Sequence, residues 1–102
     1  MTIDEFLTYE KENPYVYELF DKYTRQALKS GRKYFSARAI WERMRWQSMI
    51  EDSSEQFKIS DHPMPFYARL FEIRNPMYKG FFRKHNCPAD KLAFALNKQE
   101  LF

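Results

Sequence analysis

The segment from Pro14 to Gly31 restricts the fold more than any other, because it has the spacing of one long amphipathic helix. Proline suits the first position of a helix, and glycine supplies a left-handed stop after the last turn. Charged side chains occupy one face, and apolar residues recur every three or four positions on the other. A helix with one apolar face must bury it against other elements, so a packed helical domain is predicted. The apolar positions are Val16, Leu19, Phe20, Tyr23 and Ala27.

The length of 102 residues allows one hydrophobic core, so residues 1–102 are predicted to form a single domain. Ten Phe, seven Tyr and two Trp make the core material mainly aromatic. No apolar run approaches the ~20 residues of a membrane span, so no membrane partner is expected. The N-terminus lacks the pattern of a secretory signal, and a single cysteine, Cys87, has no partner for an internal disulfide. These features favour a cytoplasmic location.

Local signals predict four more helices. Thr2 and Glu5 have capping-box spacing, Ser36 is a good N-cap, and Pro63 and Pro88 suit first turns. Short extended segments are predicted at 33–35, 57–59 and 81–85. The remaining helices are predicted over residues 2–13, 36–51, 63–74 and 88–101.

The third and fourth helices are predicted to bury more than one side. In the third, Ala37, Ile40, Trp41, Met44 and Ser48 form one stripe, and Ala39, Trp46 and Ile50 form a second on the far side. Apolar residues cover most of the fourth helix and leave Arg69 and Glu72 as its polar face. A single core is expected from Phe20, Tyr23, Ile40, Trp41, Met44, Phe66, Leu70 and Phe71.

This order of elements predicts a mainly α, small helical domain of winged helix-turn-helix-like type with a short β element. Residues 14–85 would form the winged-helix-like core, with 63–74 as recognition helix and 79–85 in the wing. Residues 1–13 would add an N-terminal helix, and residues 86–102 a C-terminal helical tail anchored by Leu92, Leu96 and Phe102. The connection over 52–62 has eleven residues, whereas the turn in such motifs usually has about three or four.

Several blocks of the sequence carry a family pattern: 34–46 (Tyr-Phe-Ser-Ala-Arg-Ala-Ile-Trp-Glu-Arg-Met-Arg-Trp), 57–59 (Phe-Lys-Ile), 66–71 (Phe-Tyr-Ala-Arg-Leu-Phe), Asn75-Pro76 and 80–83 (Gly-Phe-Phe-Arg). This pattern, across roughly residues 14–85, resembles a family of small uncharacterised proteins of bacteria, bacteriophages and prophages. The resemblance implies a bacterial host cell and an intracellular setting. It implies no particular activity and no active-site residues.

Charge is uneven along the chain, and this points to a polyanionic partner. Residues 31–85 carry eleven Lys or Arg and six Asp or Glu, while the formal net charge of the whole chain is +3. A local excess of cations interleaved with aromatic residues is typical of a surface that contacts phosphate, which predicts binding to double-stranded DNA. The candidate DNA-binding residues are Arg38, Arg45, Lys58, Tyr67, Arg69, Arg74, Lys79, Arg83 and Lys84.

The alternative is a protein-binding module, such as a phage-encoded modulator of a host protein, or a homodimer. Exposed Tyr, Trp and Arg residues, which are enriched at interface hot spots, would serve it. The same arginines can also be explained without any binding function, as solvent-exposed side chains that pair with nearby acidic residues.

No enzyme activity is expected. The sequence has no Gly-rich phosphate loop, no nucleophile elbow and no paired-cysteine metal motif, and it contains only two glycines. His85 and Cys87 alone lack the further ligands that structural zinc requires. Catalytic residues, a metal and a cofactor are therefore not predicted.

Overall fold

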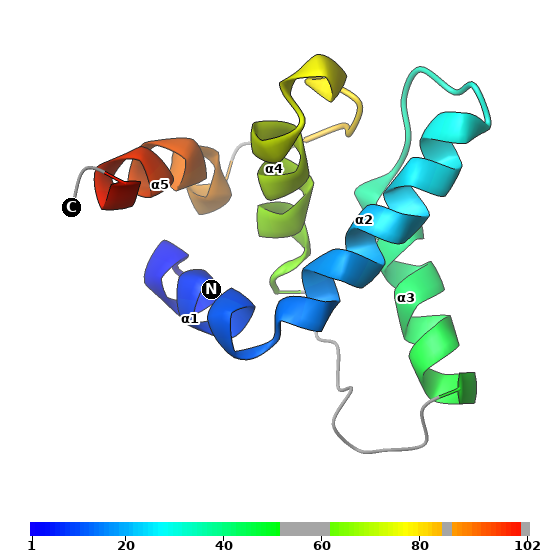
Figure 1. Ribbon diagram of the computed structural model, residues 1–102, viewed down its shortest axis with the longest axis horizontal. Coiled ribbons are helices and arrows are strands. Elements are labelled where there is room, and N and C mark those ends of the chain that lie inside the picture. Colours follow the sequence, from blue (N-terminus) through cyan, green and yellow to red (C-terminus); the bar gives the residue numbers. More distant parts are fainter. Residues whose placement is uncertain (52–61, 85–86, 101–102) are drawn as a thin grey trace.

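The computed structural model describes residues 1–51, 62–84 and 87–100. This part of the chain is mainly helical, as predicted, and forms five α-helices with two short 3-10 helices. Figure 1 shows α4 in the middle of the molecule, with α1 and α5 on one side and α2 and α3 on the other. None of the described helices is long and apolar enough to cross a bilayer. The elements are α1 (Ile3–Glu12), α2 (Pro14–Lys29), α3 (Ala37–Glu51), α4 (Met64–Arg74), η1 (Pro76–Tyr78), η2 (Pro88–Lys91) and α5 (Leu92–Glu100).

The helix boundaries follow the local signals of the sequence. At the start of α1 the backbone N–H of Glu5 donates to Thr2 Oγ1 at 3.1 Å, and that of Thr2 donates to Glu5 Oε1 at 3.0 Å, which confirms the capping box. Pro14 is the first residue of α2. Gly31, at φ 86°, ends that segment in the left-handed region where a side chain would be strained. Before α3, Ser36 Oγ accepts the backbone N–H of Ala39 at 3.2 Å.

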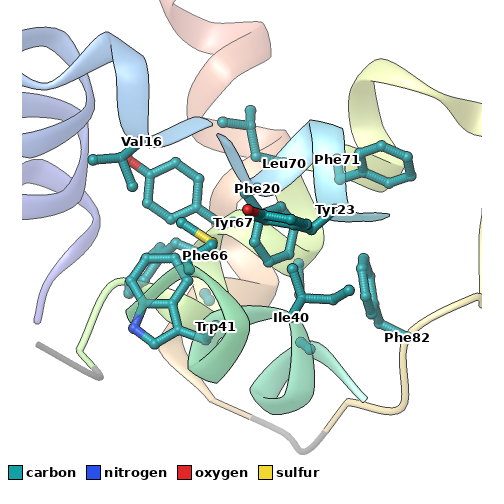
Figure 2. Close-up of a cluster of buried hydrophobic side chains, with 14 of the residues drawn as sticks. Val16, Phe20, Tyr23, Ile40, Trp41, Phe66, Tyr67, Leu70, Phe71 and Phe82 are labelled. Carbon is teal, nitrogen blue, oxygen red and sulfur yellow. The ribbon is translucent and has the colours of Figure 1, made fainter. Parts of the chain in front are cut away.

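The core is one aromatic cluster centred on Tyr67 of α4 (Figure 2). The Tyr67 ring lies 5.0 Å from Phe6 of α1, 6.0 Å from Phe20 of α2 and 5.5 Å from Trp41 of α3, measured between ring centroids. One side chain of α4 therefore contacts three of the other four α-helices. All eight predicted core residues belong to this cluster, so the prediction of a single core is confirmed.

α4 is buried around its whole circumference. The seven residues from Phe66 to Glu72 are all buried, because α2, α3, η1, η2 and α5 each pack against this helix. Arg69 and Glu72, predicted as an exposed polar face, are each only 7% exposed. The prediction that they face solvent is wrong, since η2 and the segment after η1 cover that side. A recognition helix needs an exposed face for the DNA groove, so this burial also contradicts that role for α4.

α3 differs, because it is buried on one side only. The stripe that contains Trp41 and Met44 faces the core, as predicted. The second stripe, predicted to be buried on the far side, is exposed: Trp46 is 58% and Ile50 is 61% accessible, and Met49 beside them is 72% accessible. No described element packs over these side chains, which leaves a helix face of mixed cations and large apolar residues.

Two predicted extended segments meet without forming strands. The backbone N–H of Phe35 donates to the carbonyl of Phe81 at 3.0 Å, and Phe35 and Phe82 form one isolated parallel bridge. Within the described residues no longer ladder is formed. The predicted strand at 57–59 and the connection over 52–62 lie outside the described residues, apart from His62.

The C-terminal helix packs on the domain. Leu92 is fully buried and Leu96 is partly buried against the core, as the tail prediction required. The first turn of the predicted helix is a 3-10 helix that begins at Pro88, and α5 follows it. The third predicted anchor, Phe102, lies outside the described residues.

Candidate functional site

The strongest candidate site is an open cleft of about 610 Å³ at the N-terminus of α3. Four chain segments build it: the α2–α3 connection, the first turn of α3, the start of α4 and the segment after η1. Three of its lining side chains are arginines, and the described residues that line it include no carboxylate. We call it the arginine cleft; its lining residues are Arg32, Tyr34, Phe35, Ser36, Ala37, Arg38, Met64 and Arg83.

The isolated bridge explains why arginines distant in the sequence share this cleft. The Phe35 N–H bonds to the Phe81 carbonyl, and the two rings stack at 6.3 Å with an interplanar angle of 8°. This contact places Arg83, two residues after Phe81, beside the segment that leads into α3. Arg38 lies in the first turn of α3, so both arginines reach the same cleft.

A buried carboxylate of α4 holds the segment that carries Arg83. Glu72 accepts the backbone N–H of Gly80 at 2.8 Å and that of Phe82 at 3.3 Å. Its Oε2 lies 2.6 Å from Lys84 Nζ. Gly80 has φ 88°, so the turn before the bridge requires glycine. The core helix therefore positions one wall of the cleft through hydrogen bonds to backbone.

The side chains of Arg32, Arg38 and Arg83 are all exposed to solvent. Arg32 and Arg83 form no ion pair with any described residue, and the Arg32 guanidinium lies 5.9 Å from the centre of the Phe35 ring. Arg38 is exposed on the outer face of α3. A concave site that holds several guanidinium groups matches the geometry of phosphate oxygens, which arginine binds in a bidentate manner.

A second cavity, of about 440 Å³, contains other predicted site residues but has a different character. Arg69 Nη2 lies 2.7 Å from Asp90 Oδ1, and Lys84 pairs with Glu72, so opposite charges face each other there. The backbone N–H of Cys87 and the guanidinium of Arg69, both bonded to the Asp90 carboxylate, lower its pKa. These pairs join α4 to the chain that follows it. We assign these pairs to the fold, although Arg69 and Lys84 were predicted to contact DNA. Lys79, also predicted to contact DNA, is exposed and lines this cavity instead of the arginine cleft.

The remaining predicted residues are dispersed. Arg45 lies on the outer side of α3 and pairs with Glu42 at 3.3 Å. Arg74 Nη2 lies 3.7 Å from Glu10 Oε1, and its guanidinium stacks on Tyr17 at 4.3 Å from the ring centre. Lys58 lies outside the described residues.

The prediction that Tyr67 contacts DNA is wrong. Its side chain is fully buried, and burial raises the pKa of its phenol. The hydroxyl has no hydrogen-bond partner among the described residues, although such a group is normally paired when buried. The aromatic packing that places this ring at the centre of the core therefore outweighs the desolvation of its hydroxyl.

Of the nine predicted DNA-binding residues, the described structure brings only Arg38 and Arg83 together in the arginine cleft. Sequence reasoning missed Arg32 and Tyr34 as site residues. Both lie in the basic, aromatic run that precedes α3, so the signal was present. Their proximity to Arg83 depends on the Phe35–Phe81 contact, which local patterns do not reveal.

The fold and the site define a small helical domain with a cationic, aromatic surface cleft. Comparison of the chain with family models, curated proteins and solved structures found no match. Among the described residues, no group of three or more His, Cys, Asp or Glu side chains is arranged to hold a metal ion.

Proposed function

We propose that this protein binds DNA and contacts the phosphate backbone through the arginine cleft. The observation that supports this function is the convergence of Arg32, Arg38 and Arg83 in one concave site. Phosphate contacts position a protein on a duplex without specifying sequence, so backbone recognition is the proposed mode. No reaction is proposed.

The winged helix-turn-helix interpretation enters this proposal in a changed form. We assign α3, in place of α4, as the helix that faces DNA, because Arg38 in its first turn is exposed and lines the arginine cleft. The segment over 79–84, which carries Arg83, takes the place of the wing. We further propose that the protein acts as a regulator or accessory factor of a phage or mobile element in the bacterial cytoplasm, which rests on the family resemblance of residues 14–85.

Fluorescence anisotropy with labelled duplexes at several salt concentrations tests DNA binding. Arg38→Ala and Arg83→Ala should each lower the salt slope by about one, because each phosphate contact releases about 0.9 counterion. At about 0.1 M salt this corresponds to about eightfold weaker binding per arginine, on several unrelated sequences alike.

The matched control is Lys11→Ala on α1, an exposed position that removes the same charge outside the cleft. It should leave the salt slope unchanged. Failure of the intact protein to bind any of several duplexes at about 50 mM salt contradicts the proposal. Equal effects of all three substitutions would show that only the net charge of the protein matters. That result would contradict a specific role of the arginine cleft in DNA binding.

A second candidate function is supported by the exposed apolar residues of α3. Trp46, Met49 and Ile50 have the i, i+3, i+4 spacing of one helix face, and Arg43 and Arg45 flank them. We propose an acidic amphipathic helix of a partner protein as the occupant, because its carboxylates would match Arg43, which is exposed at the edge of this face. A second copy would bring the same cations into contact and is disfavoured.

A synthetic helical peptide of Leu and Glu tests this surface by tryptophan fluorescence. We expect saturable binding that Trp46→Ser abolishes and that a Leu and Lys peptide does not reproduce. Light scattering tests whether a second copy of the chain occupies this face instead. A concentration-dependent dimer that Trp46→Ser dissociates would contradict the acidic partner.

A further inference from the structure

Tyr34 is the feature of the arginine cleft that backbone recognition leaves unexplained. Its side chain is 60% exposed, although a tyrosine ring in a small domain normally contributes to packing. Among the described residues its ring makes no aromatic contact. The ring therefore offers a face to a ligand without disturbing the core.

The chain on either side of Tyr34 is held in place. Phe35 is tied to Phe81 by a backbone hydrogen bond and by ring stacking, and the guanidinium of Arg32 lies over the Phe35 ring. An exposed aromatic residue on a restrained segment loses little conformational freedom when it binds. Tyr34 thus resembles a built stacking platform more than a mobile loop residue.

The size of the cleft indicates what could stack there. The open cleft of about 610 Å³ has room for a group the size of a small molecule. The backbone of a duplex presents phosphates to such a cleft but keeps its bases paired and stacked, so it would leave Tyr34 without a base to contact. A nucleotide outside the duplex presents both a flat base and phosphate oxygens, which match Tyr34 and the arginines.

We propose that the arginine cleft takes an unpaired nucleotide of DNA, with its base on Tyr34 and its flanking phosphates on Arg38 and Arg83. This inference rests on the proposed DNA binding and specifies the substrate class: a single strand, or a duplex with an unpaired end. A free nucleotide has the same base and phosphate, so the experiment must distinguish binding of a mononucleotide from binding of a DNA strand.

Anisotropy with four probes at one salt concentration tests the proposal: a single-stranded oligonucleotide, a duplex with a short overhang, the blunt duplex, and deoxyadenosine monophosphate as competitor. Stacking of one base adds about 5- to 150-fold in affinity. The single strand and the overhang duplex should therefore bind at least fivefold tighter than the blunt duplex.

Substitution of the ring tests the platform itself. Tyr34→Leu should remove the preference for unpaired DNA, measured as the ratio of the blunt-duplex and overhang-duplex dissociation constants, while Tyr34→Trp should retain that ratio. Phe94→Leu on α5 is the control, since Phe94 is 72% exposed and does not line the cleft. Equal thermal melting of the variants and wild type verifies that each is folded.

The outcomes separate the two proposals. Blunt and unpaired DNA bound equally, with no effect of Tyr34→Leu, overturns this inference and leaves DNA binding intact. No binding to any DNA probe overturns both. The proposal is also overturned if deoxyadenosine monophosphate binds as tightly as the oligonucleotide and its binding depends on Tyr34 in the same way. The ligand would then be a free nucleotide and not a DNA strand.

Discussion

α3 and α4 have contrasting environments that their residue types do not suggest. α4 carries Arg69 and Glu72 yet is buried on every side, whereas α3 carries Trp46, Met49 and Ile50 on a face that stays exposed. The difference arises from the elements that pack on each helix: η2 and α5 cover α4, and no described element covers the outer face of α3. Exposure in this protein is thus decided by the neighbours of a helix as much as by its own side chains.

The two tryptophans of α3 provide the sharpest test of this comparison. Trp41 is fully buried and Trp46 is 58% exposed. Trp41→Ala should lower the free energy of unfolding by about 3–5 kcal/mol, as removal of a buried aromatic ring does. Trp46→Ala should change it by no more than about 0.5 kcal/mol. Chemical denaturation measures both, and similar losses would mean that α3 is buried on two sides after all.

Substitutions in α5, which packs on α4, test how much α5 contributes to stability. Leu92 on α5 is fully buried, and its truncation to alanine should destabilise the protein by about 2–4 kcal/mol through lost burial and the cavity left behind. Phe94→Ala on the same helix removes a larger but exposed side chain and should be nearly neutral. Thermal denaturation compares them. An unchanged midpoint for Leu92→Ala would show that α5 does not contribute to the cover.

Two glutamates compare α4 with α3 directly. Glu72→Ala removes the acceptor of two backbone N–H groups and the partner of Lys84. It should cost about 1–3 kcal/mol, because the buried Phe82 N–H and the partly buried Gly80 N–H lose their acceptor. Glu42→Ala breaks only an exposed pair with Arg45 and should cost less than about 1 kcal/mol. Urea denaturation tests both substitutions.

The same two glutamates have different consequences for binding. Because Glu72 positions the segment that carries Arg83, Glu72→Ala should also weaken DNA binding in conditions where the variant is folded. Glu42→Ala should leave the binding unchanged or strengthen it slightly. If Glu72→Ala binds like wild type, the carboxylate does not position the cleft.

The smallest expected effect concerns pH at the contact between α4 and η2. The pKa of Asp90 is lowered by the Cys87 backbone N–H and by Arg69, so the ionised form is favoured in the folded protein. This stabilisation is complete above the ordinary aspartate pKa of about 3.9 and is lost as pH falls through the lower folded value. As the pH is lowered from about 5 to about 2, the urea midpoint of unfolding should fall less steeply for Asp90→Asn than for the wild-type protein. Parallel curves for the two proteins would contradict the assignment.

Much of the helical architecture was predictable because its signals are local. The capping box at Thr2, the proline that opens α2, the glycine that ends it and the Ser36 cap each act within a few residues, and the described structure contains all four. The 3.6-residue spacing likewise identified the buried stripe of α3 and the single aromatic core.

The candidate site was predictable only in part. Arg38 and Arg83 were identified from charge and lie in one cleft. Arg69 and Lys84 have the same charge but pair with Asp90 and Glu72, because chain distant in sequence folds over them. Tyr67 was mistaken for a surface residue because its chemistry suits a groove as well as a core.

The sequence by itself thus determined where most of the helices begin and end, and which residues are apolar enough to form a core, because backbone capping and side-chain periodicity act over one or two turns. Tertiary structure decided which cations face solvent, which apolar residues of α3 remain exposed, and that Arg32, Tyr34 and Arg83 share one cleft. These outcomes depend on contacts between segments tens of residues apart, such as the bond from Phe35 to Phe81, and no local pattern encodes such a pairing.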